Sequence, residues 1–357
     1  MKILIVRVSA IGDVVHTLPA FFLLKNSLPK AQISWVVQQK AASLLVDQPF
    51  LDKLWILPDK FLMPQNWKTT ERIAREMHAT HWDAIIDFQG IFKTSVLMLG
   101  LNGTKYGFDY KNARWGMSSF LTHKHTSPIY DNIIQKNLAL ASDVITNLNG
   151  AKSCPTIDQL HKECFLAIKP EQQKVIEQWL NENDIKKYIL LAPNTTWKSK
   201  HWPLEQWQKL LEIFSHDYQS IYRDYAIILL GKDFGDQAEL LATFCKERNL
   251  NIVLAPKWDL ITTSYLIDKA QLVIAPDTGV LHLADFFGTR SIGIFGPTNA
   301  QKHGSFLMNQ NKKNVIQIPC QHFYQKTHGL EQKNSNFTNC MYKLTPDQLL
   351  ERVHANL

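Results

Sequence analysis

The sequence predicts an α/β protein built from two doubly wound, Rossmann-like domains that face each other across a cleft. Short apolar runs alternate with segments of helical periodicity, and this alternation occurs twice along the chain. The chain has 357 residues, which exceeds what one hydrophobic core usually supports. We therefore expect one domain over residues 1–170 and a second over 171–340.

In the first half, buried strands and helices are expected in alternation. The apolar runs that predict strands are 3–8, 33–37, 54–57, 84–88 and 105–108. Helical spacing covers 14–24, 67–80, 92–101 and 131–148. Pro19 lies inside the first of these helices and should kink or break it. The stretch 112–127 is polar and basic, with Arg114, His123, Lys124 and His125.

The second half repeats the alternation. Strands are expected at 165–168, 188–192, 226–230, 252–254, 272–275 and 290–295. Helices are expected at 170–181, 204–216, 235–248, 261–269 and 280–287. Residues 298–340 lack periodicity, and a last helix is expected at 345–355, with Pro346 at its first position.

The stretch 272–297 organises this second half. Asp277, Thr278 and Gly279 follow a buried strand, and Gly288 ends the helix that comes next. Thr278 is a good N-cap residue, and ligands of doubly wound sheets bind at the carboxyl ends of the strands. A helix start with open N–H groups at that edge would bind an anion such as phosphate. An ordinary βαβ corner without a ligand explains the spacing about equally well.

Composition and cysteine content restrict the class of protein. The 45% hydrophobic and 20% charged residues are typical of a globular protein, and no apolar run approaches the roughly 20 residues of a membrane span. Lys2 precedes an apolar run, as in a signal peptide, but Arg7 and Asp13 interrupt it. The five cysteines are scattered without a CxxC pair, so free thiols in a reducing cytoplasm are expected.

Basic residues are concentrated in the first third of the chain. The net charge is +7, and residues 1–125 hold 15 Lys/Arg against nine Asp/Glu. An anionic partner of the N-terminal domain is indicated, whether phosphorylated lipid, nucleic acid or acidic sugar. A solvated basic surface without a partner is the alternative.

Two loops at predicted strand ends carry candidate chemistry. Asp13 follows the first strand, in a loop without the GxGxxG dinucleotide fingerprint. There it suits a general base, or equally a carboxylate stabilised by the helix dipole. In the loop 194–203, the hydroxyls of Thr195 and Thr196 and the cations Lys198 and Lys200 predict a phosphate-binding set, with a solvated basic loop as the alternative. The sequence has no DxD pair and no cysteine–histidine set with zinc spacing, so no metal is expected. His282 fits a buried structural histidine and a ligand contact equally well.

Four blocks in the chain resemble those of the ADP-heptose:lipopolysaccharide heptosyltransferases, glycosyltransferase family 9, in the family's order. They are MKILIVRVSAIGDVVHTLP, DAIIDFQGIFKTS, TTWKSKHWP and PDTGVLHLA, at residues 1–19, 83–95, 195–203 and 276–284. The closest subgroup is similar to heptosyltransferase I. Residues 298–343 are longer than that subgroup suggests and resemble other family members.

The resemblance implies a GT-B fold and metal-independent, cofactor-independent transfer of heptose from ADP-L-glycero-D-manno-heptose to the Kdo of Kdo-lipid A, with inversion. Asp13 would be the general base and Lys200 would neutralise the leaving diphosphate. The donor contacts implied by position are Thr195, Thr196, Lys200, Asp236, Asp277, Thr278, Gly279 and His282. The acceptor contacts implied are Gly12, His16, Lys60, Arg72, Arg75, Gln89, Lys93 and Arg114.

The same resemblance implies that residues 1–170 bind the acceptor and that residues 171–340 bind the ADP-sugar. We expect residues 341–357 to form a helix that packs back on the N-terminal domain. It implies a cytoplasmic protein that is peripheral on the inner membrane. There, Lys60, Lys68, Arg72 and Arg75 would bind the anionic surface without insertion. Two alternatives stay open within the fold, namely transfer to a later heptose of the core, as by heptosyltransferase II, and sugar-nucleotide epimerisation. No nucleic-acid partner is expected, because no recognised nucleic-acid-binding module is visible.

Overall fold

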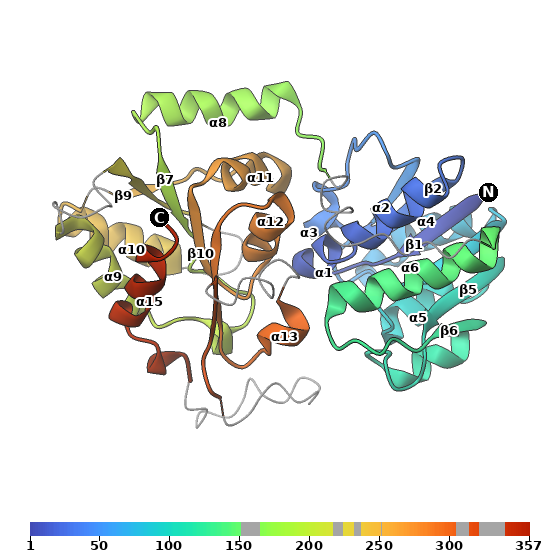
Figure 1. Ribbon diagram of the computed structural model, residues 1–357. Coiled ribbons are helices and arrows are strands. Elements are labelled where there is room, and N and C mark those ends of the chain that lie inside the picture. Colours follow the sequence, from blue (N-terminus) through green and yellow to red (C-terminus); the bar gives the residue numbers. More distant parts are fainter. Residues whose placement is uncertain (151–164, 217–223, 232–236, 251, 305–313, 321–339) are drawn as a thin grey trace. The chain divides into compact units, whose positions relative to one another are not determined.

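The computed structural model describes residues 1–150, 165–216, 224–231, 237–250, 252–304, 314–320 and 340–357. The chain divides into two compact units, Met1–Ala167 and Ile168–Leu357 (Figure 1). The division falls close to the boundary expected at residue 170. Each unit contains one six-stranded sheet whose strands all run parallel.

The first unit alternates strands and helices. Its strands are β1 (Lys2–Val6), β2 (Gln32–Gln38), β3 (Lys53–Leu57), β4 (Trp82–Asp87), β5 (Gly103–Phe108) and β6 (Lys124–Thr126). Its α-helices are α1 (Ile11–Val15), α2 (Leu18–Ser27), α3 (Gln39–Ala42), α4 (Trp67–His78), α5 (Phe92–Met98) and α6 (Ile133–Asn149). Two short 3₁₀ helices, η1 (Pro64–Asn66) and η2 (Gly116–Leu121), lie in its loops.

The second unit repeats this plan. Its strands are β7 (Tyr188–Leu191), β8 (Ala226–Leu229), β9 (Ile252–Leu254), β10 (Leu272–Pro276), β11 (Ser291–Phe295) and β12 (Val315–Gln317). Its α-helices are α8 (Pro170–Glu182), α9 (Leu204–His216), α10 (Gln237–Glu247), α11 (Leu260–Lys269), α12 (Gly279–Phe287), α13 (Ala300–His303) and α15 (Pro346–His354). The 3₁₀ helices η3 (Lys198–Lys200) and η7 (Cys340–Lys343) complete it.

Both sheets have the strand order of a doubly wound fold. The orders are β3-β2-β1-β4-β5-β6 and β12-β11-β10-β7-β8-β9, so the first strand of each unit lies beside its fourth. All residues of β10 and β11 are buried, as are Ile3 to Val6 of β1. Burial on both faces explains why these strands are continuous apolar runs rather than alternating ones.

The interruption that Pro19 predicts in the helix at 14–24 is confirmed, because the segment forms two helices, α1 and α2, and Pro19 occupies the first turn of the second. Other local expectations need correction. Edge strands β6 and β12 lie in stretches where no strand was expected. Conversely, residues 165–168 form no strand. In their place, the backbone N–H of Ala167 donates to Gln48 Oε1 at 2.8 Å.

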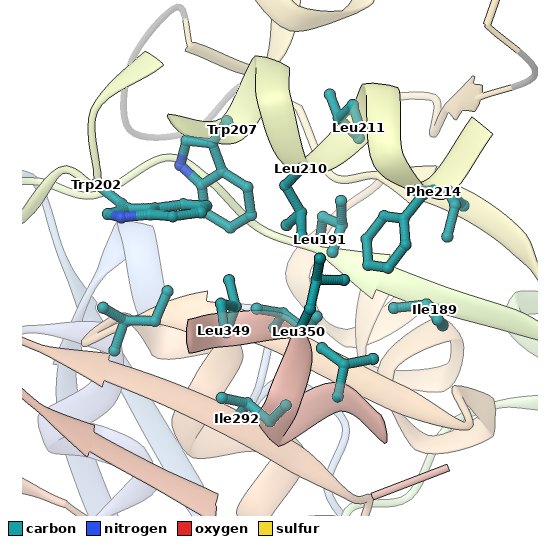
Figure 2. Close-up of a cluster of buried hydrophobic side chains, with 14 of the residues drawn as sticks. Ile189, Leu191, Trp202, Trp207, Leu210, Leu211, Phe214, Ile292, Leu349 and Leu350 are labelled. Atoms are coloured by element: carbon teal, nitrogen blue, oxygen red, sulfur yellow. The ribbon is translucent and has the colours of Figure 1, made fainter. Parts of the chain in front are cut away.

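The C-terminal helix packs on the second unit, so the expectation that it returns to the N-terminal domain is wrong. Leu349 of α15 is fully buried in the same cluster as Trp207 of α9 (Figure 2). Val353 of α15 is fully buried in this cluster too. Just before the helix, Trp202 Nε1 donates to the carbonyl of Leu344 at 3.0 Å. The apolar stripe of α15 therefore finds its complement on α9 of its own unit.

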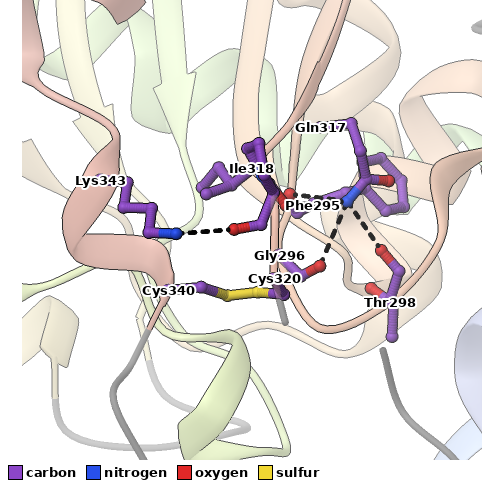
Figure 3. The surroundings of a disulfide bond; sticks show 9 residues. Phe295, Gly296, Thr298, Gln317, Ile318, Cys320, Cys340 and Lys343 are labelled. Atoms are coloured by element: carbon purple, nitrogen blue, oxygen red, sulfur yellow. Dashed lines mark hydrogen bonds between the residues drawn. A yellow bond between two sulfur atoms is a disulfide. The ribbon is translucent and has the colours of Figure 1, made fainter. Parts of the chain in front are cut away.

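Two of the cysteines form a disulfide, so the expectation of free thiols is wrong for this pair. Cys320 and Cys340 are bonded, with their Cα atoms 5.4 Å apart (Figure 3). Nearby, Gln317 Nε2 donates to the carbonyl of Gly296 at 3.1 Å, and Lys343 Nζ donates to that of Pro319 at 3.2 Å. The disulfide joins the chain after β12 to η7, just ahead of α15. Cys245 is a free, buried thiol.

Candidate functional site

Polar side chains gather at the topological switch point of each sheet. In doubly wound folds, ligands bind at the carboxyl ends of the strands where the strand order reverses. In the first unit this point lies between β1 and β4, and in the second between β7 and β10.

Asp13 lies in α1, shortly after β1, with one quarter of its side chain exposed. Its Oδ1 is 3.0 Å from Arg7 Nη2, and its Oδ2 is 3.5 Å from Arg114 Nη1. Burial raises the pKa of this carboxyl, but the positive charges of Arg7 and Arg114 lower it more, to about 2. The backbone N–H of Ala10 also donates to Oδ2, at 3.2 Å. Asp13 is therefore a partly accessible carboxylate that stays ionised at neutral pH.

Arg7 is a candidate site residue that the sequence did not predict. The Arg7 side chain is only 3% exposed. In addition to its ion pair with the Asp13 carboxylate, its Nε donates a hydrogen bond to the backbone carbonyl of Asp13 at 3.2 Å. Its Nη1 donates to the carbonyl of Phe88, at the end of β4. A cation inside an apolar strand run was available as a signal, because buried arginines are almost always paired.

Asp87 and Gln89 tie the ends of β4 and β1 together. Gln89 is 4% exposed, accepts from the N–H of Val8 at 2.8 Å and donates to the carbonyl of Ser9 at 2.9 Å. Burial raises the pKa of Asp87 to about 6, although the N–H groups of Gln89 and Gly90 bind its Oδ1. At 1% exposure, Asp87 is closed to a large substrate, whereas Asp13 is open.

The other expected acceptor residues fall into two groups. Gly12 shares α1 with Asp13, and the buried His16 caps that helix and interacts electrostatically with Asp13. The remaining cations Lys60, Arg72, Arg75 and Lys93 are all exposed. No described contact joins them to Asp13, and Arg75 pairs with Glu71 at 2.7 Å.

In the second unit the structure brings together Lys200, Asp277 and His282. Lys200 Nζ lies 2.7 Å from Asp277 Oδ2, and His282 Nε2 lies 2.9 Å from Oδ1. They come from η3 after β7, from the end of β10 and from the first turns of α12. Burial raises the pKa of Asp277, but Lys200 and His282 outweigh it and hold the pKa well below its usual range.

This arrangement assigns different tasks to the three side chains. The Asp277 carboxylate is 7% exposed, with one partner at each oxygen, so it orients Lys200 and His282. The Lys200 side chain is 20% exposed, and its ammonium keeps donors for an anion. A cation held this way loses little side-chain entropy when an anionic ligand binds.

The remaining expected donor residues differ in how far the structure supports them. Thr195 is buried and donates to the carbonyl of Trp197 at 2.7 Å, whereas Thr196 is exposed. Thr278 occupies the N-cap of α12, next to Gly279, but its Oγ1 makes no capping bond. Asp236 lies outside the described residues.

Two findings concern metals and membranes. Among the residues that the structure describes, no three His, Cys, Asp or Glu side chains are grouped so that they could hold a metal ion. Within the same part of the chain, no helix is both long and apolar enough to cross a membrane.

Comparison with known proteins identifies the family. Residues 70–334 match the family described as glycosyltransferase family 9 (heptosyltransferase). The chain belongs to glycosyltransferase family 9. Over 345 residues it is 26% identical to lipopolysaccharide heptosyltransferase 1 of Escherichia coli K12, covering 92% of this chain and 100% of that protein. The resemblance expected from the four sequence blocks is thus confirmed.

Solved structures of heptosyltransferases share the fold. E. coli heptosyltransferase WaaC with ADP superposes with a TM-score of 0.73 at 21% identity, covering 100% of both chains. E. coli ADP-heptose lps heptosyltransferase II gives 0.70 at 16% identity, covering 99% of this chain and 98% of that one. With the two parallel six-stranded sheets, these likenesses confirm the predicted GT-B fold of this family 9 glycosyltransferase.

Proposed function

We propose that this family 9 glycosyltransferase transfers heptose from ADP-L-glycero-D-manno-heptose to a Kdo residue of the lipopolysaccharide inner core. The observation that carries the proposal is the alignment with lipopolysaccharide heptosyltransferase 1 over that protein's whole length. The likeness to heptosyltransferase II favours a second candidate, transfer to a heptose already on the core. The enzyme would work at the cytoplasmic face of the inner membrane as a peripheral protein.

In the proposed mechanism, Asp13 takes the proton of the acceptor hydroxyl as its oxygen attacks the anomeric carbon. The new carbon–oxygen bond forms on the face opposite the diphosphate, so the configuration inverts. The bond to the diphosphate breaks, and ADP leaves with the electron pair. Lys200 stabilises the charge that develops on the leaving group, which is the task a metal ion performs in other enzymes.

The remaining site residues have binding tasks in this proposal. The first unit binds the acceptor near Asp13, through Gly12, His16, Gln89, Lys93 and Arg114. In the second unit, Thr195, Thr196, Thr278, Gly279 and His282 bind the donor, and Asp277 acts by orienting Lys200. Lys60, Arg72 and Arg75 meet the phosphates and carboxylates of the lipid acceptor.

Mass spectrometry tests the proposal directly. Kdo-lipid A and heptosyl-Kdo-lipid A are each incubated with ADP-heptose and the full chain. A mass gain of one heptose on Kdo-lipid A supports the first candidate, and a gain only on the heptosylated lipid supports the second. Conversion of ADP-heptose, without any acceptor, to an isomer of unchanged mass that separates by chromatography would instead identify an epimerase.

Arg7→Met is expected to move the acidic limb of the kcat/KM profile upward by about 1–3 pH units, because an opposite charge lowers a carboxyl pKa by that amount. The base is active above its pKa. Because the pKa of Asp13 is about 2, the acidic limb that this residue produces in the wild-type kcat/KM profile lies far below neutral pH. The wild-type and variant pH–rate profiles check this. An unmoved limb would show that Arg7 does not set the protonation of the base.

Lys200→Ala is expected to weaken ADP-heptose binding by about 1.5–3 kcal/mol, the contribution of a hydrogen bond to a charged group. Titration calorimetry with ADP measures this directly. Lys198→Ala is the matched control, since Lys198 is an exposed cation of the same 3₁₀ helix. An affinity of Lys200→Ala equal to that of the wild type would remove Lys200 from the donor site.

A further inference from the structure

Apolar and aromatic side chains form an exposed surface around η2 in the first unit. We call Phe92, Tyr110, Trp115, Met117 and Phe120 the η2 surface. Phe120 is 72% exposed, Tyr110 62%, Phe92 56% and Met117 52%. Single exposed apolar residues are ordinary, but a contiguous group of this size marks an interaction site.

The 3₁₀ helix η2 at the centre of this surface is amphipathic, but its polar side is buried and its apolar side is exposed. Side chains at i and i+3 of a 3₁₀ helix lie above one another, so Met117 and Phe120 share one face. That face is exposed, while Ser118 and Ser119 are 1% and 6% exposed. Ser119 Oγ donates to the carbonyl of Gly116 at 2.8 Å, which satisfies the polar side within the protein. An arrangement that buries serine and exposes Met and Phe suits an apolar partner.

Ring contacts and backbone bonds hold the surface together. The rings of Phe92 and Trp115 meet edge to face at 5.4 Å, and those of Tyr110 and Phe120 lie 6.3 Å apart. The backbone N–H of Trp115 donates to a carbonyl after β4 at 2.7 Å. A Cβ at Gly116 would lie 2.9 Å from the Tyr110 ring, so glycine permits this close approach. The surface is therefore preformed.

The charges around the surface fit an anionic partner. Residues 90–125 contain five Lys/Arg and one acidic residue, Asp109. Asp109 already accepts from Ser127 Oγ and from the N–H of Asn112. Arg114, directly before Trp115, lies 3.5 Å from Asp13. The partner should be apolar, anionic and next to the candidate base.

We propose that the η2 surface docks on an anionic lipid bilayer, with Met117 and Phe120 entering the boundary between headgroups and acyl chains. Aromatic residues with neighbouring cations are the side chains that favour this boundary. The inference rests on the proposed function in one respect, that the acceptor is carried by a lipid. It differs from association through surface charge alone, because part of the binding comes from apolar insertion.

Vesicle flotation tests the inference. The full chain is mixed with phosphatidylcholine vesicles with and without phosphatidylglycerol, at low and high salt. The double variant Met117→Ser/Phe120→Ser is expected to lose roughly tenfold or more in partitioning, the value of burying one such side chain. The matched control Leu240→Ser/Leu254→Ser removes two exposed apolar side chains of the second unit and should partition like wild type. Thermal melts verify that both variants are folded.

Salt and a second substrate separate the possible outcomes. Exposed charges are screened within about 10 Å at 0.1 M salt, so binding that disappears completely at high salt would overturn insertion. Equal partitioning of the double variant and the wild type would overturn the assignment of the surface. On a water-soluble, acyl-free acceptor the double variant should transfer heptose as fast as wild type. A slower rate would place these residues in the acceptor site instead, and failure of the wild type with every acceptor would reject the proposed function.

Discussion

Asp13→Asn is expected to lower kcat by about 10²–10⁴-fold, the range that a general base contributes. Asparagine keeps the size of the side chain but cannot take the acceptor proton. The loss should appear in kcat with the ADP affinity unchanged, because Asp13 lies in the first unit and the candidate donor residues lie in the second. Steady-state kinetics with Kdo-lipid A and calorimetry with ADP measure the two quantities.

A stability measurement must accompany these kinetics, because Asp13 also neutralises Arg7. Asp13→Asn leaves a buried guanidinium without its carboxylate, so the free energy of unfolding should fall as well. Asp59→Asn is the control, since it removes a more exposed carboxylate 3.9 Å from Lys40. If folded Asp13→Asn protein kept near wild-type turnover, Asp13 would be a structural partner of Arg7 and not the base.

Asp277→Ala is expected to lower the free energy of unfolding by about 3–5 kcal/mol, the cost of removing one partner from a buried ion pair. The lower end applies if water reaches the partly exposed Lys200 ammonium. Donor affinity should fall as well, since Lys200 loses the group that orients it. Chemical denaturation at neutral pH measures the stability. Asp268→Ala is the control, because its pair with Lys269 is more exposed and contributes about 1 kcal/mol or less.

The effect of Asp277→Ala should depend on pH in a defined direction. The folded protein holds the pKa of Asp277 well below its usual range, so the ionised carboxylate stabilises the fold. That contribution is complete above the unfolded value of about 3.9 and declines as the pH falls below it. The stabilities of wild type and variant should therefore converge in acid. A constant difference down to low pH would show that the loss comes from packing alone.

The sequence was most informative where local signals agree with the fold. The helix after Asp277 ends at Gly288 as expected. The backbone at Gly288 is left-handed, a conformation that favours glycine over other residues. The edge strands β6 and β12 were missed because each lies in a stretch without regular periodicity, whereas β9, which is equally short, was predicted from its apolar run. A three-residue strand in such a stretch is defined by its neighbour in the sheet. The predicted packing partner of α15 was wrong for a similar reason, since an apolar stripe on a helix does not specify which unit the helix packs against.

The candidate site shows the same limit. Lys200, Asp277 and His282 were each predicted, but as parallel donor contacts. Only their distances show that the Asp277 carboxylate lies between the lysine ammonium and the histidine ring, with one partner at each oxygen. The role of Arg7 depends on the ends of β1 and β4 lying side by side, which no sequence spacing reveals. The Cys320–Cys340 disulfide is similar, because the pairing of scattered cysteines is a property of the fold.

The position of β1 in the middle of its sheet has a consequence for synthesis on the ribosome. Ile3 pairs with Ile33 on one side and with Ala84 on the other. The first half of the sheet can therefore assemble while β4 has yet to leave the exit tunnel. During that interval β1 has an open edge, and Arg7 lacks the carbonyl of Phe88 that will accept from it. An unpaired, apolar strand edge is a site of aggregation, so a translational pause shortly before β4 would lower the yield of folded enzyme more than one placed after it.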